Sequence, residues 1–228
     1  MSSGLSAHIN PSILNADFNN LENEIKKIAA VSDLLHLDIM DNKFVPNQTF
    51  TFERASEIIA SSSIGVDAHL MIENPDELAP KYAQAGCISV TFHFEAATSV
   101  PDVIANIRSN GAKVGMAIKP KTSFAEIEKY LNQIDMLLIM TVEPGFGGQS
   151  FMADQMDKVS AARQALTKKG LNQTLLQVDG GISEETIAVA AKAGADCFVA
   201  GSAVYRSDDP AQMVKRLRSL ANLELTKD

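Results

Sequence analysis

The chain has 228 residues, 46% of them hydrophobic, and a formal net charge of −8 at neutral pH. This length fits one α/β barrel as well as two small domains, and the lack of a Pro/Gly/Ser-rich linker favours a single domain spanning 1–228. An acidic chain without clustered Lys and Arg is a poor match for nucleic acid or an anionic membrane surface. A small molecule is therefore the expected partner.

Cys87 and Cys197 are the only cysteines. Two cysteines are too few for a disulfide framework, and they lack the spacing of zinc ligands. No apolar stretch reaches membrane-spanning length, and Met1–His8 has neither the basic start nor the apolar core of a signal peptide. We therefore expect a cytoplasmic protein with no membrane partner.

Short apolar runs alternate with segments of helical periodicity along the chain. Eight strands are predicted, at Ile9–Leu14, Leu34–Asp38, Gly65–Met71, Ile88–His93, Val114–Ile118, Met136–Val142, Leu175–Asp179 and Cys197–Ala200. Between them, apolar residues recur at helical spacing, as they do from Phe18 to Ile28. Asp209-Pro210 offers an N-cap and a first-turn proline to the last helix.

Eight strand–helix units predict a single (β/α)8 TIM barrel. A doubly wound open sheet is the alternative, but no Gly-x-Gly-x-x-Gly follows the first strand.

Four polar residues end predicted strands. His36 and Asp38 are two apart, so both side chains lie on one face of their strand. His69 ends the third strand and Asp179 the seventh, and in a parallel barrel these ends meet on one rim. Two imidazoles and two carboxylates are a credible ligand set for a divalent metal. A lone His-x-Asp pair can also be a structural couple, and His93, which ends the fourth strand, rivals His69.

Glycine-rich turns follow the last three strands, at Glu143–Gln149, Asp179–Gly181 and Ala200–Ala203. Glycine permits positive φ and lets backbone N–H groups approach an anion. Gly201-Ser202 could also open a short helix whose positive end faces the same place. Since these turns contain no Lys or Arg, we expect the backbone to hold a phosphate group there.

Met40, Met71 and Met140 fall at or just beyond the ends of three strands. Methionine commonly fills cores, but three methionines from different strands at one rim also suit a dry lining for reacting carbons. Ser12, near the end of the first strand, directs its hydroxyl toward the same rim.

Taken together, these residues resemble the ribulose-phosphate 3-epimerase family. The matching stretches run in order from the first strand to the eighth: Pro11–Leu14, His36–Asp41 with Phe44–Asn47, His69–Met71, Thr91–His93, Gly115–Thr122, Met140–Gln149, Val178–Gly181 and Gly201-Ser202. The resemblance implies a barrel of the ribulose-phosphate-binding type. It also implies an isomerase that inverts C3 of D-ribulose 5-phosphate to give D-xylulose 5-phosphate in the pentose phosphate pathway.

The resemblance further implies one divalent ion, Zn²⁺ or Fe²⁺ with Mn²⁺ and Co²⁺ as alternatives, and a homo-oligomer, either dimer or hexamer. It makes His36, Asp38, His69 and Asp179 the metal ligands, which settles His69 over His93, and it assigns Asp38 and Asp179 as the two acid/base groups. The substrate-binding residues expected on this basis are Ser12, His69, Gly145, Phe146, Gly147, Gly148, Asp179, Gly180, Gly181, Gly201 and Ser202.

One local departure follows Asp41, where the family commonly has Gly and then a basic residue or His. This chain has Asn42-Lys43. Asn tolerates the left-handed conformation better than most non-glycine residues, so only the shape of this loop is in question.

Three alternatives remain open. The first is a lyase of the same barrel group, a decarboxylase or aldolase acting on a sugar phosphate. Such decarboxylases resemble one another in an Asp-x-Lys-x-x-Asp motif. Asp41-Asn42-Lys43 begins this motif, but Pro46 occupies its last position. A hexulose-6-phosphate 3-epimerase would need only a longer pocket. A non-catalytic sugar phosphate-binding protein would leave the paired aspartates without a purpose.

Overall fold

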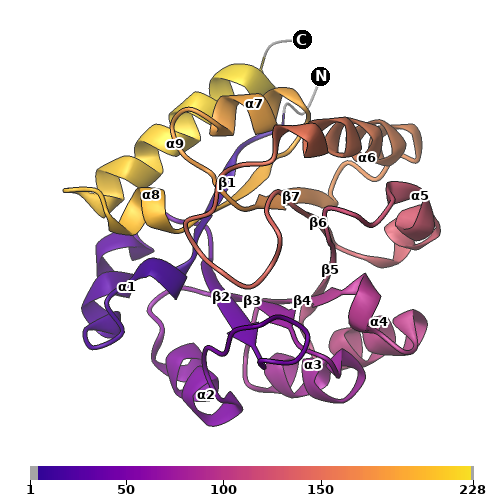
Figure 1. Ribbon diagram of the computed structural model, residues 1–228, viewed down its shortest axis with the longest axis horizontal. Coiled ribbons are helices and arrows are strands. Elements are labelled where there is room, and N and C mark those ends of the chain that lie inside the picture. The colour runs from indigo at the N-terminus through magenta and orange to yellow at the C-terminus, as the bar shows by residue number, and fades with distance from the viewer. Residues whose placement is uncertain (1–4, 227–228) are drawn as a thin grey trace.

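The computed structural model describes residues 5–226 (Figure 1). Residues 1–4 and 227–228, which belong to the predicted domain 1–228 and in part to the N-terminal segment considered above, lie outside this range. The strands are β1 (His8–Pro11), β2 (Leu35–Met40), β3 (Val66–Met71), β4 (Ser89–His93), β5 (Lys113–Ile118), β6 (Met136–Met140), β7 (Leu175–Asp179) and β8 (Cys197–Ala200).

All eight strands are parallel, in the order β1-β8-β7-β6-β5-β4-β3-β2. They form a nearly closed barrel with helices around it, and the predicted TIM barrel is confirmed. The seam lies between β1 and β2, where the isolated bridge between Ser12 and His36 joins the two edge strands.

The first strand is shorter than predicted. It ends at Pro11, and Ile13–Asn15 forms the 3₁₀ turn η1, whose N-cap Ser12 accepts a hydrogen bond from the Leu14 N–H through its hydroxyl. A Ser side chain that bonds the backbone two residues on competes with strand pairing. The other seven strands agree with prediction to within two residues at each end.

The helices surround the barrel in Figure 1. They are α1 (Leu21–Ala29), α2 (Phe52–Ser61), α3 (Pro75–Gln84), α4 (Val100–Ser109), α5 (Phe124–Ile127), α6 (Met156–Lys168), α7 (Ile187–Lys192), α8 (Ser202–Tyr205) and α9 (Pro210–Leu225), with 3₁₀ segments η2 (Phe94–Ala96), η3 (Glu128–Gln133) and η4 (Ala153–Gln155). Asp209 caps α9 as predicted, because its carboxylate accepts from the Gln212 N–H. Within residues 5–226, none of these helices has the length and apolar content needed to cross a membrane.

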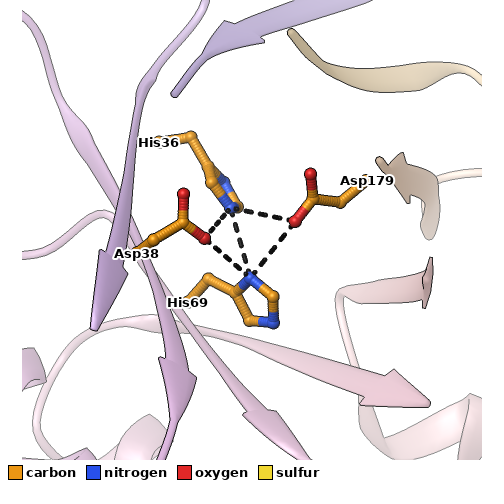
Figure 2. A group of neighbouring side chains, drawn as sticks. All are labelled: His36, Asp38, His69 and Asp179. Carbon is orange, nitrogen blue, oxygen red and sulfur yellow. Dashed lines mark hydrogen bonds and ion pairs between the residues drawn. The ribbon is translucent and has the colours of Figure 1, made fainter. Parts of the chain in front are cut away.

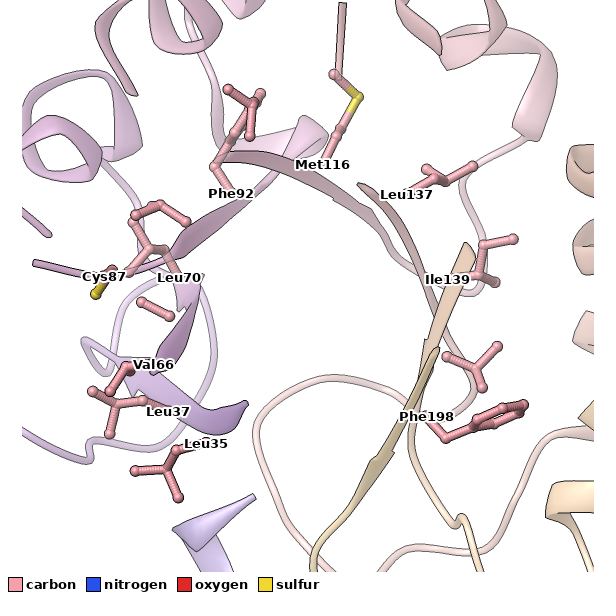
Figure 3. Close-up of a cluster of buried hydrophobic side chains, with 14 of the residues drawn as sticks. Leu35, Leu37, Val66, Leu70, Cys87, Phe92, Met116, Leu137, Ile139 and Phe198 are labelled. Carbon is pink, nitrogen blue, oxygen red and sulfur yellow. The ribbon is translucent and has the colours of Figure 1, made fainter. Parts of the chain in front are cut away.

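Strand periodicity sorts the side chains of the barrel into two sets. Apolar side chains lie on its outer side and form the main core with the helices (Figure 3); they include Leu35, Leu37, Val66, Leu70, Phe92, Met116, Leu137, Ile139 and Phe198. Part of the interior is polar instead, since Gln177 on β7 donates a hydrogen bond across the barrel to Asp67 on β3. The main hydrophobic core thus lies outside the barrel, and the interior combines polar groups with a smaller apolar cluster of Ala117, Leu138, Met140 and Val142.

The last helix is bound to the residues that precede β1 and β2. Arg218 donates to Ala7 O at 2.9 Å, to Val31 O at 2.6 Å and to Asp33 Oδ2 at 2.8 Å. Asn222 on the same helix accepts from the Ala7 N–H at 2.8 Å. Because one sheet runs from His8 to Ala200 and α9 returns to its start, we propose that the chain forms one domain.

The ion pair of Asp33 predicts a pH-dependent contribution to stability. Burial alone raises the pKa of Asp33, but hydrogen bonds from His8, the Ile9 N–H and Arg218 outweigh it and lower the pKa to about 2. A lowered pKa stabilises the folded state above the ordinary pKa of 3.8, and this stabilisation is lost as the pH falls toward about 2.

We therefore expect Asp33→Asn to lower the free energy of unfolding at pH 7 by about 1–2 kcal/mol, less than the full pKa shift implies because the side chain is partly exposed. The difference from wild type should shrink as the pH approaches 2. Urea unfolding over a pH series measures this, with Asp208→Asn in an exposed loop as the control. A loss that stays constant with pH would contradict the prediction.

Candidate active site

Four side chains from β2, β3 and β7 converge inside the barrel (Figure 2). Asp179 ends β7 as predicted, but β2 continues to Met40, so His36 is its second residue and not at its carboxyl end. His36 Nε2 lies 3.4 Å from His69 Nδ1 and 3.4 Å from Asp38 Oδ1. His69 Nδ1 lies 3.2 Å from Asp38 Oδ1 and 3.5 Å from Asp179 Oδ2. One ligand atom from each of the four residues lies within 4.8 Å of the others, so this group could hold a metal ion.

The ring nitrogen of His36 that faces away from the other three side chains also has a partner. Its Nδ1 lies 2.9 Å from Asp67 Oδ2 on β3. Asp67 also accepts from Ser89 Oγ at 2.6 Å and from Gln177 Nε2 at 3.1 Å. Asp67 stands two residues before His69, the same spacing that relates His36 to Asp38. This spacing predicts that its side chain points into the barrel, although Asp67 was not among the predicted site residues.

The outer nitrogen of His69 faces His93. The two Nε2 atoms are 3.0 Å apart, and His93 Nδ1 lies 3.2 Å from Glu95 Oε2. His93 is therefore behind His69 and is not among the four residues that converge. This agrees with the choice of His69 that the family resemblance implied.

Burial and the two carboxylates act in opposite directions on the imidazoles. Burial lowers the pKa of His36, but the charge and hydrogen bond of Asp38, with the hydrogen bond of Asp67, raise it well above the ordinary value. Burial likewise lowers the pKa of His69, and hydrogen bonds to Asp179 and Asp38 raise it overall. For Asp38, burial raises the pKa, and His36 and His69 together lower it well below its usual range. This site attracts positive charge.

The donor set fits a divalent ion of the transition series. Two imidazole nitrogens and two carboxylate oxygens point at one another, while the outer nitrogen of each imidazole already has a partner. Imidazoles that bind metal usually have such a second partner, which fixes the orientation of the ring.

A pocket opens above the four residues. The predicted catalytic, substrate-binding and lining residues at its wall are Ser12, Asp38, Met40, Met71, Met140, Gly145, Phe146, Gly147, Gly148, Asp179, Gly180, Gly181, Gly201 and Ser202. His36 and His69 are fully buried and do not line it. The histidines thus lie beneath the pocket, and only the two carboxylates of the group reach it.

Asn15 is a pocket residue that the sequence analysis missed. Its side chain lies between two of the glycine turns, because a Cβ atom added at Gly147 or at Gly201 would come within 2.9 or 2.6 Å of Asn15 Oδ1. Its position depends on the η1 turn after β1, which no periodicity in the sequence predicts.

Two adjacent glycines in the turn after β7 are required by the backbone. Gly180 has φ +124° and Gly181 has φ +67°. A Cβ at Gly181 would lie 2.5 Å from Phe151 N, and one at Gly180 would lie 2.8 Å from Val142 N. The chain after β6 therefore packs directly on this turn, and Thr141 fastens it further by donating to Gly180 O at 2.6 Å.

The turn after β2 keeps its shape without glycine. Asn42 has φ 57°, in the left-handed region, as its residue type allows. Asp41 accepts the N–H groups of Lys43, Phe44 and Glu73, and Lys43 pairs with Glu73. Neither Asp41 nor Lys43 lines the pocket, which argues against the lyase pattern.

Comparison with known proteins finds relatives of this chain. A model of the Ribulose-phosphate 3 epimerase family matches residues 8–205. The ribulose-phosphate 3-epimerase of Mycobacterium tuberculosis is 47% identical over 213 residues, which cover 93% of this chain and 92% of that protein. The ribulose-phosphate 3-epimerase of Bacillus subtilis is 38% identical over 209 residues, covering 91% and 96%.

Solved structures of lower identity share the fold. 3-Hexulose-6-phosphate synthase from Salmonella typhimurium aligns with a TM-score of 0.67 at 18% identity, over 95% of this chain and 99% of that one. Orotidine 5'-phosphate decarboxylase from Pyrococcus horikoshii aligns with a TM-score of 0.64 at 12% identity, over 93% and 98%. These structures share the TIM-barrel fold of this chain. By the extent of the sequence match, the chain belongs to the ribulose-phosphate 3-epimerase family.

Proposed function

We propose that this protein interconverts D-ribulose 5-phosphate and D-xylulose 5-phosphate by inverting C3, as an isomerase of the pentose phosphate pathway. The observation that carries the proposal is the pair of carboxylates, Asp38 from β2 and Asp179 from β7, which reach one pocket from different sides of the barrel and share the same two imidazoles. Family membership supports the same reaction.

Inversion at a carbon beside a ketone requires a proton to leave one face and another to arrive at the opposite face. The strands that carry Asp38 and Asp179 have β1 and β8 between them around the barrel, so the two carboxylates can address opposite faces of one substrate. In our proposal one removes the C3 proton, the other returns a proton, and the roles exchange with the direction of reaction. Ser12 Oγ donates to Asp38 Oδ2 at 2.5 Å and orients this carboxylate.

His36, Asp38, His69 and Asp179 would hold one divalent ion in this proposal. Zn²⁺ and Fe²⁺ suit the mixed nitrogen and oxygen ligands, with Mn²⁺ and Co²⁺ as alternatives. When bound, the ion supplies positive charge that stabilises the enediolate left after proton removal. The two histidines act only as ligands, since both are shielded from the pocket.

The phosphate end of the substrate would bind at the glycine turns after β6, β7 and β8. The pocket has no Lys or Arg among its described lining residues, so backbone N–H groups and the hydroxyl of Ser202 must recognise the anion. Because α8 has only one turn, its dipole adds little. Met40, Met71 and Met140 also line the pocket, and in this proposal they exclude water from the reacting carbons.

Two further features belong to this proposal. Cys87 and Cys197 are buried free thiols, which suits a cytoplasmic enzyme. We also propose a homo-oligomer, a dimer or hexamer, by resemblance to the family, and light scattering of the purified protein tests it.

Replacing either carboxylate should stop epimerisation. We expect Asp38→Asn and Asp179→Asn each to lower kcat by at least about 10²–10⁴-fold, because each loses an acid/base group and a metal ligand. Wild-type enzyme in D₂O should incorporate deuterium at C3, and residual exchange in either variant should be confined to one epimer. Glu73→Gln, an exposed carboxyl outside the pocket, is the control.

Proton NMR of both pentulose phosphates follows C3 exchange and interconversion together. Near-normal turnover by either aspartate variant would sink the two-base scheme. The same assay on a hexulose 6-phosphate decides between a five-carbon and a six-carbon substrate.

Metal removal should abolish activity reversibly. Exhaustive chelation is expected to leave folded, inactive protein, and activity should return in proportion to bound Zn²⁺ or Fe²⁺ up to one ion per chain. His36→Gln should fail to recover, whereas His8→Gln, which alters a histidine paired with Asp33 outside the site, should recover fully. Elemental analysis of each assayed sample gives the stoichiometry, and activity unrelated to bound metal would contradict the metal role.

A further inference from the structure

A line of polar side chains continues outward from His69. His69 Nε2 lies 3.0 Å from His93 Nε2, and His93 Nδ1 lies 3.2 Å from Glu95 Oε2. The other oxygen of this carboxylate, Oε1, accepts the Lys119 N–H at 2.7 Å and the Thr122 hydroxyl. His93 is fully buried, so water cannot replace His69 or Glu95 as its hydrogen-bond partner.

The proton positions along this line follow from the fixed donors. Because Glu95 is an acceptor, His93 Nδ1 carries the hydrogen of that bond and His93 Nε2 offers a lone pair. Only one hydrogen can lie between the two Nε2 atoms, so it belongs to His69. A neutral His69 with hydrogen on Nε2 has its lone pair on Nδ1, the atom that faces Asp38 and Asp179.

We propose that His93 and Glu95 are positioning residues that fix the tautomer of His69 and so keep its Nδ1 free to bind the metal ion. The inference rests on the metal site of the proposed function. It gives His69 the kind of support that Asp67 gives His36, with one imidazole inserted between ligand and carboxylate.

The surroundings keep this line in place. The ring of Phe44 packs on His93 with 4.9 Å between ring centroids, and Lys119 Nζ lies 3.7 Å from the centroid of Phe44. Glu95 is held from two sides, by the backbone of Lys119 and by Thr122. The carboxylate therefore has one orientation, which a group of the same shape would inherit.

Glu95→Gln tests the proposal with little change of shape. The Lys119 N–H is a backbone donor that cannot turn away, so the amide oxygen must face it and the NH₂ group must face His93 Nδ1. His93 then has to place its hydrogen on Nε2, and His69 must carry its own on Nδ1, where the metal should bind. Zn²⁺ affinity should fall by about 10–100-fold, the usual effect of losing such a partner.

Two measurements separate this effect from a general loss of structure. Nitrogen-15 NMR of the metal-free protein at alkaline pH reports which nitrogen of His69 carries hydrogen, and a competition titration with a chromophoric chelator gives the Zn²⁺ affinity. Thr122→Val is the matched control, because it removes a donor from Glu95 but leaves the acceptor for His93. It should keep the wild-type tautomer and affinity.

A second pair of variants covers the case in which Glu95→Gln does not fold. His93→Gln places an amide oxygen near His69 Nε2 and should retain the tautomer, whereas His93→Phe offers no acceptor and should lose it. Wild-type tautomer and affinity in Glu95→Gln, or equal behaviour of the two His93 variants, would overturn the proposal. Wild-type protein that binds no Zn²⁺ would instead contradict the metal site, and the tautomers measured without metal would still decide the role of Glu95.

Discussion

The site depends on one constraint, which is the free-energy cost of burying a polar or charged group inside the barrel without a hydrogen-bond partner. Leaving such a group unpaired costs about 1–3 kcal/mol, and more for a charged group. Asp67 meets the constraint by binding His36, Ser89 and Gln177 at once. This carboxylate therefore joins β3 to three other strands, β2, β4 and β7, and the orientation of His36 is fixed by the packing of the barrel rather than by a metal.

Much of the fold was predictable because each step obeys a local rule. Apolar runs predicted seven strands to within two residues, and the grouping of His36, Asp38, His69 and Asp179 was also predicted, although His36 does not lie at the carboxyl end of β2. The end of β1 was not predictable by this means, because a side-chain bond from Ser12 and not hydrophobicity ends it.

Some site residues could not be assigned from the sequence because their roles depend on contacts between segments that are distant in the chain. Strand position alone could not separate His69 from His93, since both lie in the carboxyl-terminal half of their strands and both point inward. The difference is that His93 is one strand farther around, beside Glu95. Asn15 lies on an irregular turn and reaches the pocket through tertiary packing. Asp67 could have been found, because it repeats the spacing that identified Asp38.

The seam of the barrel has a consequence for how folding and activity are related. Within residues 5–226, β1 and β2 share no ladder, and the seam is joined by the isolated bridge between Ser12 and His36 and by hydrogen bonds that link β1 to Asp33 and Leu34. Ser12 also binds Asp38. The weakest junction of the sheet thus contains a ligand and a base of the proposed reaction. A chain whose other seven junctions are formed but whose seam is open would have native-like secondary structure and no complete site, so recovery of activity after refolding should report barrel closure more strictly than circular dichroism does.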